Sequence, residues 1–231
     1  MPQPLAAPRR HVHGRRKGKR LTAYRQGLLE TLLPGLAFDP AAARAVPAER
    51  RLWLEIGFGK GEHLAWQAGR HPDILVLGCE PFENGVASLL AQIDADQIGN
   101  IRIHMGDARE AIDALPDAAV DRVFLLHPDP WPKPRHIKRR FVRPDNLDAL
   151  ARVMRDDAEL RLGTDDAGYS AWSLMQFSRH PAFAWPAETA ADWQVRPDDW
   201  PQTRYEQKAA RAGRRSVYLR LRRRPRAEAA L

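Results

Sequence analysis

From residue 51 onward, short apolar segments alternate with longer amphipathic ones, and this alternation constrains the fold more than any other feature. The apolar segments have the composition of strands buried on both faces, and they comprise 51–56, 74–80, 101–104, 120–126, 158–163 and 216–221. The segments between them are helical in pattern and comprise 62–70, 83–95, 108–114, 145–155 and 167–179. This order predicts the α/β class, with a mostly parallel sheet and helices on both faces.

The ends of the chain differ in composition from the middle. Residues 1–20 are rich in proline, arginine and glycine, which predicts a flexible basic N-terminal arm. A short helix is expected over 22–33, ended by Pro34-Gly35. Residues 21–224 then form a single domain, and 225–231 form a C-terminal tail. A chain of 231 residues is long enough for one full hydrophobic core.

Several function classes are excluded by what the sequence lacks. No apolar run reaches the roughly 18 residues that would span a bilayer, and the basic N-terminus has no apolar signal segment. We therefore expect a soluble, cytoplasmic protein. Cys79 is the only cysteine, which excludes a disulfide framework, and its apolar strand predicts a small core residue. No two histidines have the i, i+4 spacing of a helical metal site, so no metal is expected.

Charge is strongly segregated along the chain. Three segments contain no acidic residue and hold 22 of the 37 lysines and arginines: 1–25, 133–143 and 211–226. The remainder holds 15 basic against 29 acidic residues. Cationic blocks on an acidic body predict binding to a polyanion, with nucleic acid as the leading candidate. Purely solubilising charge is the alternative interpretation.

A glycine-rich loop joins the first predicted strand to the next helix, with the pattern Glu55-x-Gly57-x-Gly59-x-Gly61. Glycine permits positive φ and close approach of the backbone to a ligand, although a tight strand–helix turn has the same pattern. Glu80 ends the second strand, where a carboxylate can accept both hydrogen bonds of a ribose diol, and Asp107 follows the third. The three acids are therefore predicted to point into one crevice.

The loop favours S-adenosylmethionine over a dinucleotide. Its spacing is G-x-G-x-G, and Glu55 and Glu62 flank it. Two carboxylates would repel a diphosphate, whereas a sulfonium with an α-amino group is cationic. A P-loop is excluded because Lys60 is followed by Gly61 and not by serine or threonine.

The fourth strand runs into a proline-rich turn, His127-Pro-Asp-Pro-Trp-Pro-Lys133. This rigid turn would present Asp129 and Trp131 at the same edge of the sheet, with Trp131 either stacked on a base or packed on the sheet. A basic run follows, and Asp165 ends the fifth strand. The residues Thr203–Glu206 are, on their own, best interpreted as a surface turn.

These motifs together resemble the bacterial tRNA (guanine-N7)-methyltransferase family over about residues 15–223. The resemblance rests on Leu54–Gly61, Gly106-Asp-Ala108, Pro128-Asp-Pro-Trp-Pro-Lys133, Gly163-Thr-Asp165 and Thr203-Arg-Tyr-Glu206. It implies a Rossmann-like class I methyltransferase with a seven-stranded sheet. It further implies methylation of guanine 46 in the variable loop of tRNA, by a monomer or homodimer with no evident protein partner.

The resemblance also assigns site residues. The contacts to S-adenosylmethionine would come from Glu55, Gly57, Gly59, Gly61, Glu80, Asp107 and Asp129. Contacts to the acceptor would come from Lys133, Asp165, Thr203, Arg204, Tyr205 and Glu206. The RNA-contacting run would be Arg135, His136, Ile137, Lys138, Arg139 and Arg140.

The expected chemistry needs no general base, because N7 of guanine carries an unprotonated lone pair. We expect Asp129 to be the catalytic carboxylate that favours the cationic purine. Two alternatives remain: a methyltransferase acting on another RNA or on protein, and a non-catalytic RNA-binding protein. Retention of the full set of acids disfavours the second alternative.

Overall fold

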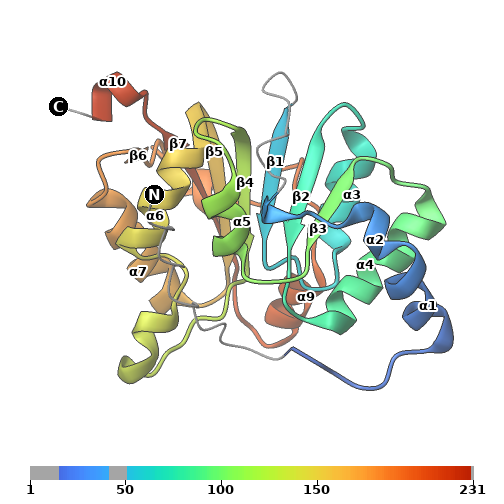
Figure 1. Ribbon diagram of the computed structural model, residues 1–231. Coiled ribbons are helices and arrows are strands. Elements are labelled where there is room, and N and C mark those ends of the chain that lie inside the picture. The colour runs from blue at the N-terminus through green and yellow to red at the C-terminus, as the bar shows by residue number, and fades with distance from the viewer. Residues whose placement is uncertain (1–15, 42–50, 230–231) are drawn as a thin grey trace.

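A computed structural model describes residues 16–41 and 51–229, and its centre is a seven-stranded sheet (Figure 1). The strand order is β3-β2-β1-β4-β5-β7-β6, in which the first five pair in parallel and the last two pairings are antiparallel. The strands are β1 (Leu52–Ile56), β2 (Leu75–Cys79), β3 (Ile101–His104), β4 (Val120–Leu126), β5 (Met154–Thr164), β6 (Phe183–Ala184) and β7 (Val217–Arg223). The predicted Rossmann-like α/β sheet is confirmed.

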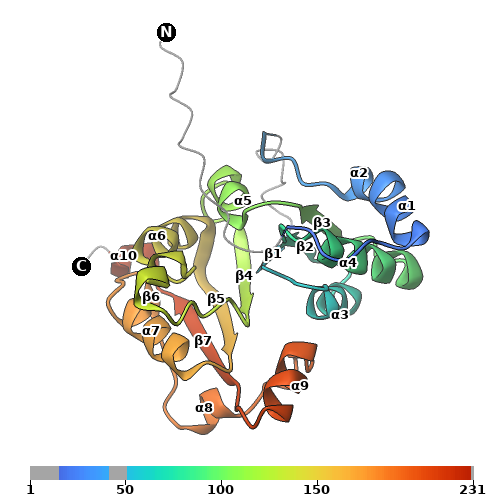
Figure 2. The same cartoon turned by 90° about the horizontal axis from the view of Figure 1, so that it is seen from below.

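Helices cover both faces of this sheet. They are α1 (Ala23–Thr31), α2 (Leu33–Leu36), α3 (Glu62–Arg70), α4 (Glu83–Asp96), α5 (Ala108–Ala114), the 3-10 helix η2 (Pro134–Arg139), α6 (Pro144–Val153), α7 (Ala167–Ser178), α8 (Ala191–Gln194), α9 (Arg204–Arg211) and α10 (Arg226–Ala229). Side chains alternate along β1, so that Leu52, Leu54 and Ile56 pack with α5, α6 and α7 while Trp53 packs with α3 and α4. Figure 2 shows α3 on the face opposite α5 and α6.

Most predicted elements are present, with ends shifted by up to four residues. The helix expected over 22–33 is wrong in its ending: α1 stops at Thr31, and Pro34 lies in the first turn of α2. Proline is tolerated there because the amide of a first-turn residue has no helical acceptor. The short elements α2, β6, η2, α8, α9 and α10 were not predicted.

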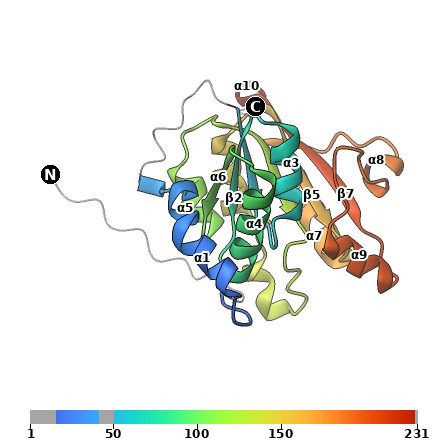
Figure 3. The ribbon, with the colours of Figure 1, turned by 90° about the vertical axis from the view of Figure 1, so that its right-hand side faces the viewer.

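Both ends of the described chain are tied to the domain. The predicted arm lies outside the described residues up to residue 15. Residues 16–20 lie against the start of α4, where Glu83 N donates to the Arg16 carbonyl and Asn84 Nδ2 to the Lys19 carbonyl (Figure 3). At the other end, Arg226 donates to the Met154 carbonyl. Within the described ranges, no helix is both long and apolar enough to cross a membrane.

Candidate functional site

The glycine loop follows β1, and its backbone is not covered by side chains at Gly57. Gly57, Gly59 and Gly61 have φ angles of +72°, +59° and +80°, a region that side chains with a Cβ rarely adopt. The loop is closed by a hydrogen bond of 2.9 Å from Gly61 N to the carbonyl of Phe58. A Cβ on Gly57 would meet nothing within 4 Å, so this position faces open space. A ligand can therefore approach the Gly57 backbone directly.

Glu80 lies directly after β2 and is tied to the glycine loop. Its two carboxylate oxygens accept hydrogen bonds of 2.8 Å from Gly59 N and 2.9 Å from Phe82 N. The side chain is largely buried. Burial raises the pKa of this carboxyl above its ordinary value, although the two backbone donors oppose the shift.

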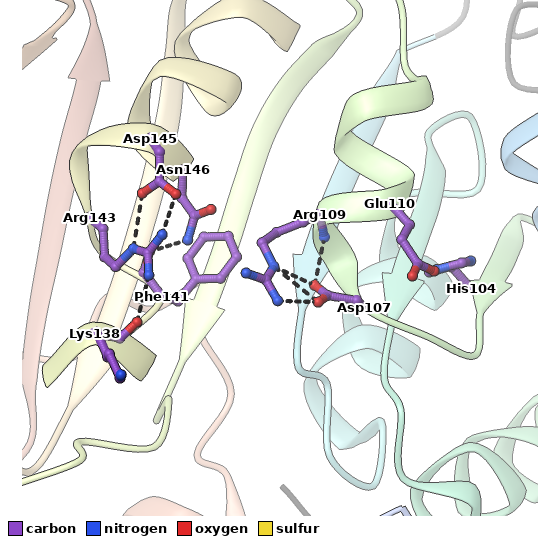
Figure 4. A network of polar contacts seen from close by, with 9 residues as sticks. All are labelled: His104, Asp107, Arg109, Glu110, Lys138, Phe141, Arg143, Asp145 and Asn146. Carbon is purple, nitrogen blue, oxygen red and sulfur yellow. Dashed lines mark hydrogen bonds and ion pairs between the residues drawn. The ribbon is translucent and has the colours of Figure 1, made fainter. Parts of the chain in front are cut away.

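Two adjoining hollows open at this edge of the sheet, and Ile56, Gly57 and Phe141 line both. The first has a volume of about 380 Å³ and is lined by Asp107 and Arg109 of the α5 start. Asp107 caps α5 and accepts hydrogen bonds of 3.0 Å from Arg109 N and Nε. Figure 4 shows this pair facing Phe141 across the hollow.

The opposite wall of the first hollow is held by its own polar contacts, also drawn in Figure 4. Arg143 donates to Asp145 Oδ1 at 2.9 Å and to the Lys138 carbonyl at 2.5 Å. Asn146 Nδ2 donates to the Phe141 carbonyl at 2.7 Å. These bonds fix the segment after η2 to the first turn of α6.

The second hollow, of about 490 Å³, is acidic. Glu80 and Asp129 line it together with Tyr205, Trp131 and Arg139. In the described part of the chain, the exposed carboxylate of Asp129 has neither a hydrogen bond nor an ion pair. The charge of Asp129 adds to burial in raising the pKa of Glu80. Burial and then the two carboxylates likewise raise the pKa of the Tyr205 phenol.

The turn that carries Asp129 is rigidly held. His127 and Trp131 both have positive φ, +48° and +44°, which is costly for a side chain with a Cβ and persists only where the surroundings impose it. His127 N donates to the Gly163 carbonyl at 2.7 Å. Arg140 Nε donates to the Pro130 carbonyl at 2.8 Å. Strand β5 and Arg140 therefore hold the turn on either side of Asp129.

Tyr205 forms the outer wall of the acidic hollow. Its ring, half exposed, is stacked on His127 with a centroid separation of 6.0 Å and an interplanar angle of 17°. The start of α9 is fixed by a capping box, in which Thr203 and Glu206 each accept a hydrogen bond from the other's backbone N. Glu206 is buried and also accepts a hydrogen bond from the Tyr218 hydroxyl.

The structure brings most of the predicted site residues together, but not all. Gly57, Glu80 and Asp129 share one hollow, and Asp107 lies in the adjoining one. The prediction that Glu55 points into the same crevice is wrong. Glu55 precedes the last residue of β1, so alternation turns it to the α3 face, where its Oε2 lies 2.7 Å from His63 Nδ1.

The four residues of the predicted acceptor segment also separate. Tyr205 reaches the acidic hollow, whereas Thr203 and Glu206 are buried in the capping box. The Arg204 side chain lies 3.8 Å from Glu62, away from this hollow. The prediction of an ordinary surface turn for this segment is wrong, because the segment begins helix α9.

Asp165 is placed at the rim by two partners. Arg214 Nε lies 2.7 Å from its Oδ2, and His127 Nδ1 lies 3.3 Å from its Oδ1. Burial alone would raise the pKa of Asp165, but these two hydrogen bonds keep it below its ordinary value. The carboxylate is therefore ionised and supports His127.

The predicted RNA-contacting run forms η2 and has two kinds of members. Arg135 and Lys138 have exposed side chains, as does Lys133, the predicted acceptor contact that precedes η2. Arg140 is buried and lies over the rings of Tyr169 and Trp172, so it stabilises the fold and does not face solvent.

Trp131 packs against this same run. Arg139 lies over its ring at 4.9 Å, and the His136 ring meets its edge at 5.6 Å. Slight burial and the neighbouring cations lower the pKa of His136, which favours its neutral form. Ile137 is half-buried, and its predicted RNA contact stays a prediction.

The C-terminal basic block is not a free cationic surface. The register of β7 on β5 places its arginines beside acids: Arg220 lies 2.7 Å from Glu159, and Arg222 lies 3.2 Å from Asp157. These two arginines therefore add less positive charge to the surface than the sequence suggests, and nucleic-acid binding by the block stays a prediction.

Several lining residues of the first hollow were not predicted as site residues, and Arg109 and Phe141 are examples. Each lies only beside a predicted motif and carries no pattern of its own.

Comparison with known proteins defines first the class and then the family. The chain matches the family model described as a putative methyltransferase over residues 49–219. Its fold resembles a 16S rRNA (adenine(1408)-N(1))-methyltransferase variant from Catenulisporales acidiphilia, with a TM-score of 0.51 and 19% identity over 82% of this chain and 93% of that one. It also resembles the precorrin-6y C5,15-methyltransferase of Geobacter metallireducens, with a TM-score of 0.51 and 13% identity over 90% of this chain and 92% of that one.

Proteins found by sequence comparison have a much higher sequence identity to this chain. The chain is 49% identical to the tRNA (guanine-N(7)-)-methyltransferase of Rhodospirillum rubrum, covering 93% of this chain and 88% of that protein. It is 48% identical to the protein of the same name from Zymomonas mobilis, covering 93% and 94%. The chain belongs to the tRNA (guanine-N7)-methyltransferase family, which confirms the resemblance found in its motifs.

Proposed function

We propose that this protein transfers the methyl group of S-adenosylmethionine to N7 of guanine 46 in the variable loop of tRNA. Membership of the family supports the reaction class. The observation that carries the proposal is the pair Glu80 and Asp129, two carboxylates that face one hollow beside the bare glycine loop. Their mutual repulsion is relieved by a cationic occupant, and a sulfonium is cationic.

The residues of the two hollows fit this cofactor. Glu80 is placed to accept the ribose hydroxyls, and Asp107 lies at the end of the adjoining hollow, where the base of the cofactor would bind. The open face of Gly57 lets the ligand pass close to the backbone. Glu55 lies on the α3 side of the sheet and contacts His63, so its predicted contact with the cofactor stays a prediction. S-adenosylmethionine, when bound there, supplies an electrophilic methyl group.

The chain's own residues then orient the acceptor and stabilise charge. The N7 lone pair forms the new bond to carbon, and the electrons of the broken carbon–sulfur bond stay on sulfur, so no proton leaves N7. Asp129 stabilises the positive charge that the purine acquires. Tyr205 positions the base, and Asp165 acts through His127. Glu206 is a positioning residue for α9.

The remaining contacts are proposed to be with RNA phosphates. Lys133, Arg135 and Lys138 are exposed, Lys138 lines the first hollow, and Trp131 and Arg139 of the same segment line the acidic one. Such contacts position an RNA without reading its sequence, and they weaken steeply with salt.

The test is methyl transfer from labelled S-adenosylmethionine to an unmodified tRNA transcript with guanine or adenine at the variable-loop position. We expect labelled 7-methylguanosine from the guanine transcript alone. Asp129→Ala should lower turnover about a hundredfold, since one lost electrostatic contact of this kind has about that effect. Asp96→Ala, an exposed acid at the far end of α4, is the matched control. Label in another nucleoside, or a loss below about threefold in Asp129→Ala, would contradict the proposal.

A further inference from the structure

A third hollow, of about 340 Å³, lies on the outer side of the glycine loop, between that loop and α9. Lys60 and Glu62 line it from the loop side, and Arg204, Lys208 and Arg211 line it from the helix. Lys208 lies outside every motif and basic segment of the sequence analysis, whereas Lys60 belongs to the glycine loop and Arg211 begins the basic segment 211–226. Figure 1 shows α9 at the lower edge of the sheet, where the parallel strands end.

The helix presents its cations on a single face. Arg204, Lys208 and Arg211 are spaced i, i+4 and i+7, so they lie along one stripe of α9, and all three are exposed. The opposite stripe is buried through Glu206 and Ala209. Because the capping box and the Tyr218 hydrogen bond anchor that buried stripe, the cationic stripe is held toward the hollow.

Positive charge in this hollow is largely uncompensated. Glu62 is its one acidic lining residue, and that carboxylate already lies 3.8 Å from the Arg204 guanidinium. Within the described residues, the side chains of Lys60, Lys208 and Arg211 form no ion pair. This contrasts with the arginines of β7, which are paired with acids of β5.

Tyr205 is the wall between this basic hollow and the acidic one. It lines both, and its ring lies 3.2 Å from where a Cβ on Gly59 would be. Tyr205 therefore lines one hollow together with Glu80 and Asp129 and another together with Lys208 and Arg211. A nucleotide has the matching distribution, because its methylated base is cationic and its phosphates are anionic.

We propose that the hollow between the glycine loop and α9 binds phosphates of the RNA strand next to the methylated guanine, with Lys208 and Arg211 as the principal contacts. The inference rests on the proposed function for the position of the guanine. The exposed cations of η2 lie beyond the acidic hollow on the side of Trp131 and Arg139. The RNA strand would thus cross the acidic hollow between two basic flanks, and Tyr205 would separate the base from the phosphates that follow it.

The test compares two double variants that remove the same charge. Lys208→Ala with Arg211→Ala removes the proposed contacts, while Arg51→Ala with Arg179→Ala removes two exposed cations at the opposite edge of the sheet. Direct binding of a tRNA transcript is measured at several salt concentrations, together with binding of S-adenosylmethionine and the melting temperature. Both substitutions in α9 are on its exposed stripe, so we expect no loss of folding.

We expect the α9 variant to bind tRNA about tenfold more weakly and to reduce the slope of log K against log salt by about 1.4, as two lost contacts to a single strand predict. The KM for tRNA should rise, while kcat and cofactor affinity stay within about twofold. Exchange of the two cations, Lys208→Arg with Arg211→Lys, should restore binding because phosphate contacts depend on charge. Equal tRNA affinity and salt slope in the two double variants would overturn the inference. A wild-type protein that makes no 7-methylguanosine would contradict the proposed function. The comparison of tRNA binding by the two double variants would still test this inference, because binding is measured directly.

Discussion

The close approach of α4 to the glycine loop gives a sharp test of how the loop is held. Gly85 lies in the first turn of α4, and a Cβ added there would be 2.1 Å from the carbonyl oxygen of Gly59. Ordinary contact begins at 3.4 Å, so the Gly59 carbonyl would have to move by about 1.3 Å. Gly59 also donates its N–H to the Glu80 carboxylate. Gly85→Ala therefore disturbs the proposed cofactor site without altering any polar side chain.

The magnitude follows from two opposing effects. Alanine favours a helix over glycine by about 1 kcal/mol, while overpacking against backbone typically costs about 1–3 kcal/mol. We therefore expect Gly85→Ala to lower the free energy of unfolding by about 1 kcal/mol, or a melting temperature by about 2–4 °C. Displacement of Gly59 also shifts the Glu80 carboxylate that it holds, so we expect at least a tenfold loss of affinity for S-adenosylmethionine, equivalent to about 1.4 kcal/mol.

Thermal unfolding and calorimetric titration with S-adenosylmethionine measure both effects. Gly27→Ala is the matched control, because Gly27 lies inside α1 and its Cβ would meet nothing within 4 Å. The control should raise the melting temperature and leave cofactor affinity unchanged. If Gly85→Ala behaved like Gly27→Ala in both measurements, the account of the loop as a backbone held between α4 and Glu80 would be refuted.

Three further predictions test residues around the site. Arg140→Lys should lower the free energy of unfolding by about 2 kcal/mol by removing a buried guanidinium that holds the Asp129 turn, whereas Lys138→Ala should leave thermal unfolding unchanged and weaken tRNA binding. Affinity for S-adenosylmethionine should fall as the pH is lowered, and the fall should begin at a higher pH than for an ordinary carboxyl, because burial raises the pKa of Glu80. Calorimetry on Glu80→Gln should show weak binding without that pH dependence. Glu206→Gln should destabilise α9 by about 1–2 kcal/mol and bring the raised pKa of the Tyr218 phenol back toward its ordinary value, as an ultraviolet titration would show.

The strands of the parallel sheet were predictable because they are buried on both faces. Segments such as 74–80 and 120–126 therefore have near-continuous apolar sequences that few other environments produce. Helix α9 was missed for the opposite reason, since only Glu206 and Ala209 of its eight residues are buried and it has no apolar stripe. The signal that could have found it is the spacing of Thr203 and Glu206, which is that of a capping box.

The candidate site was predictable for residues that follow the ends of strands. It was not predictable for residues whose role depends on which face of the sheet their side chain takes. Glu80 directly follows β2, and Asp107 follows β3 after Met105 and Gly106, so topology alone brings both to one edge of the sheet. Glu55 is still inside β1, and there a single position decides which face a side chain takes. Likewise, the pairing of Arg220 with Glu159 depends on the long-range register of β7 on β5, which no local pattern encodes.

The arrangement of charge links these observations and has a consequence for kinetics. Ion pairs between β7 and β5 neutralise Glu159 and Asp157, whereas exposed cations remain on η2 and α9, and Glu80 and Asp129 line the acidic hollow. Exposed cations that meet phosphates are screened by salt over about 8–10 Å, whereas contacts of a ligand with Glu80 and Asp129 are short and partly enclosed. Raising the salt from about 50 to 200 mM should therefore increase KM for tRNA by at least tenfold and change kcat little. Steady-state kinetics at several salt concentrations would show this, and a parallel fall of kcat would mean that the carboxylates act through long-range potential and not through contact.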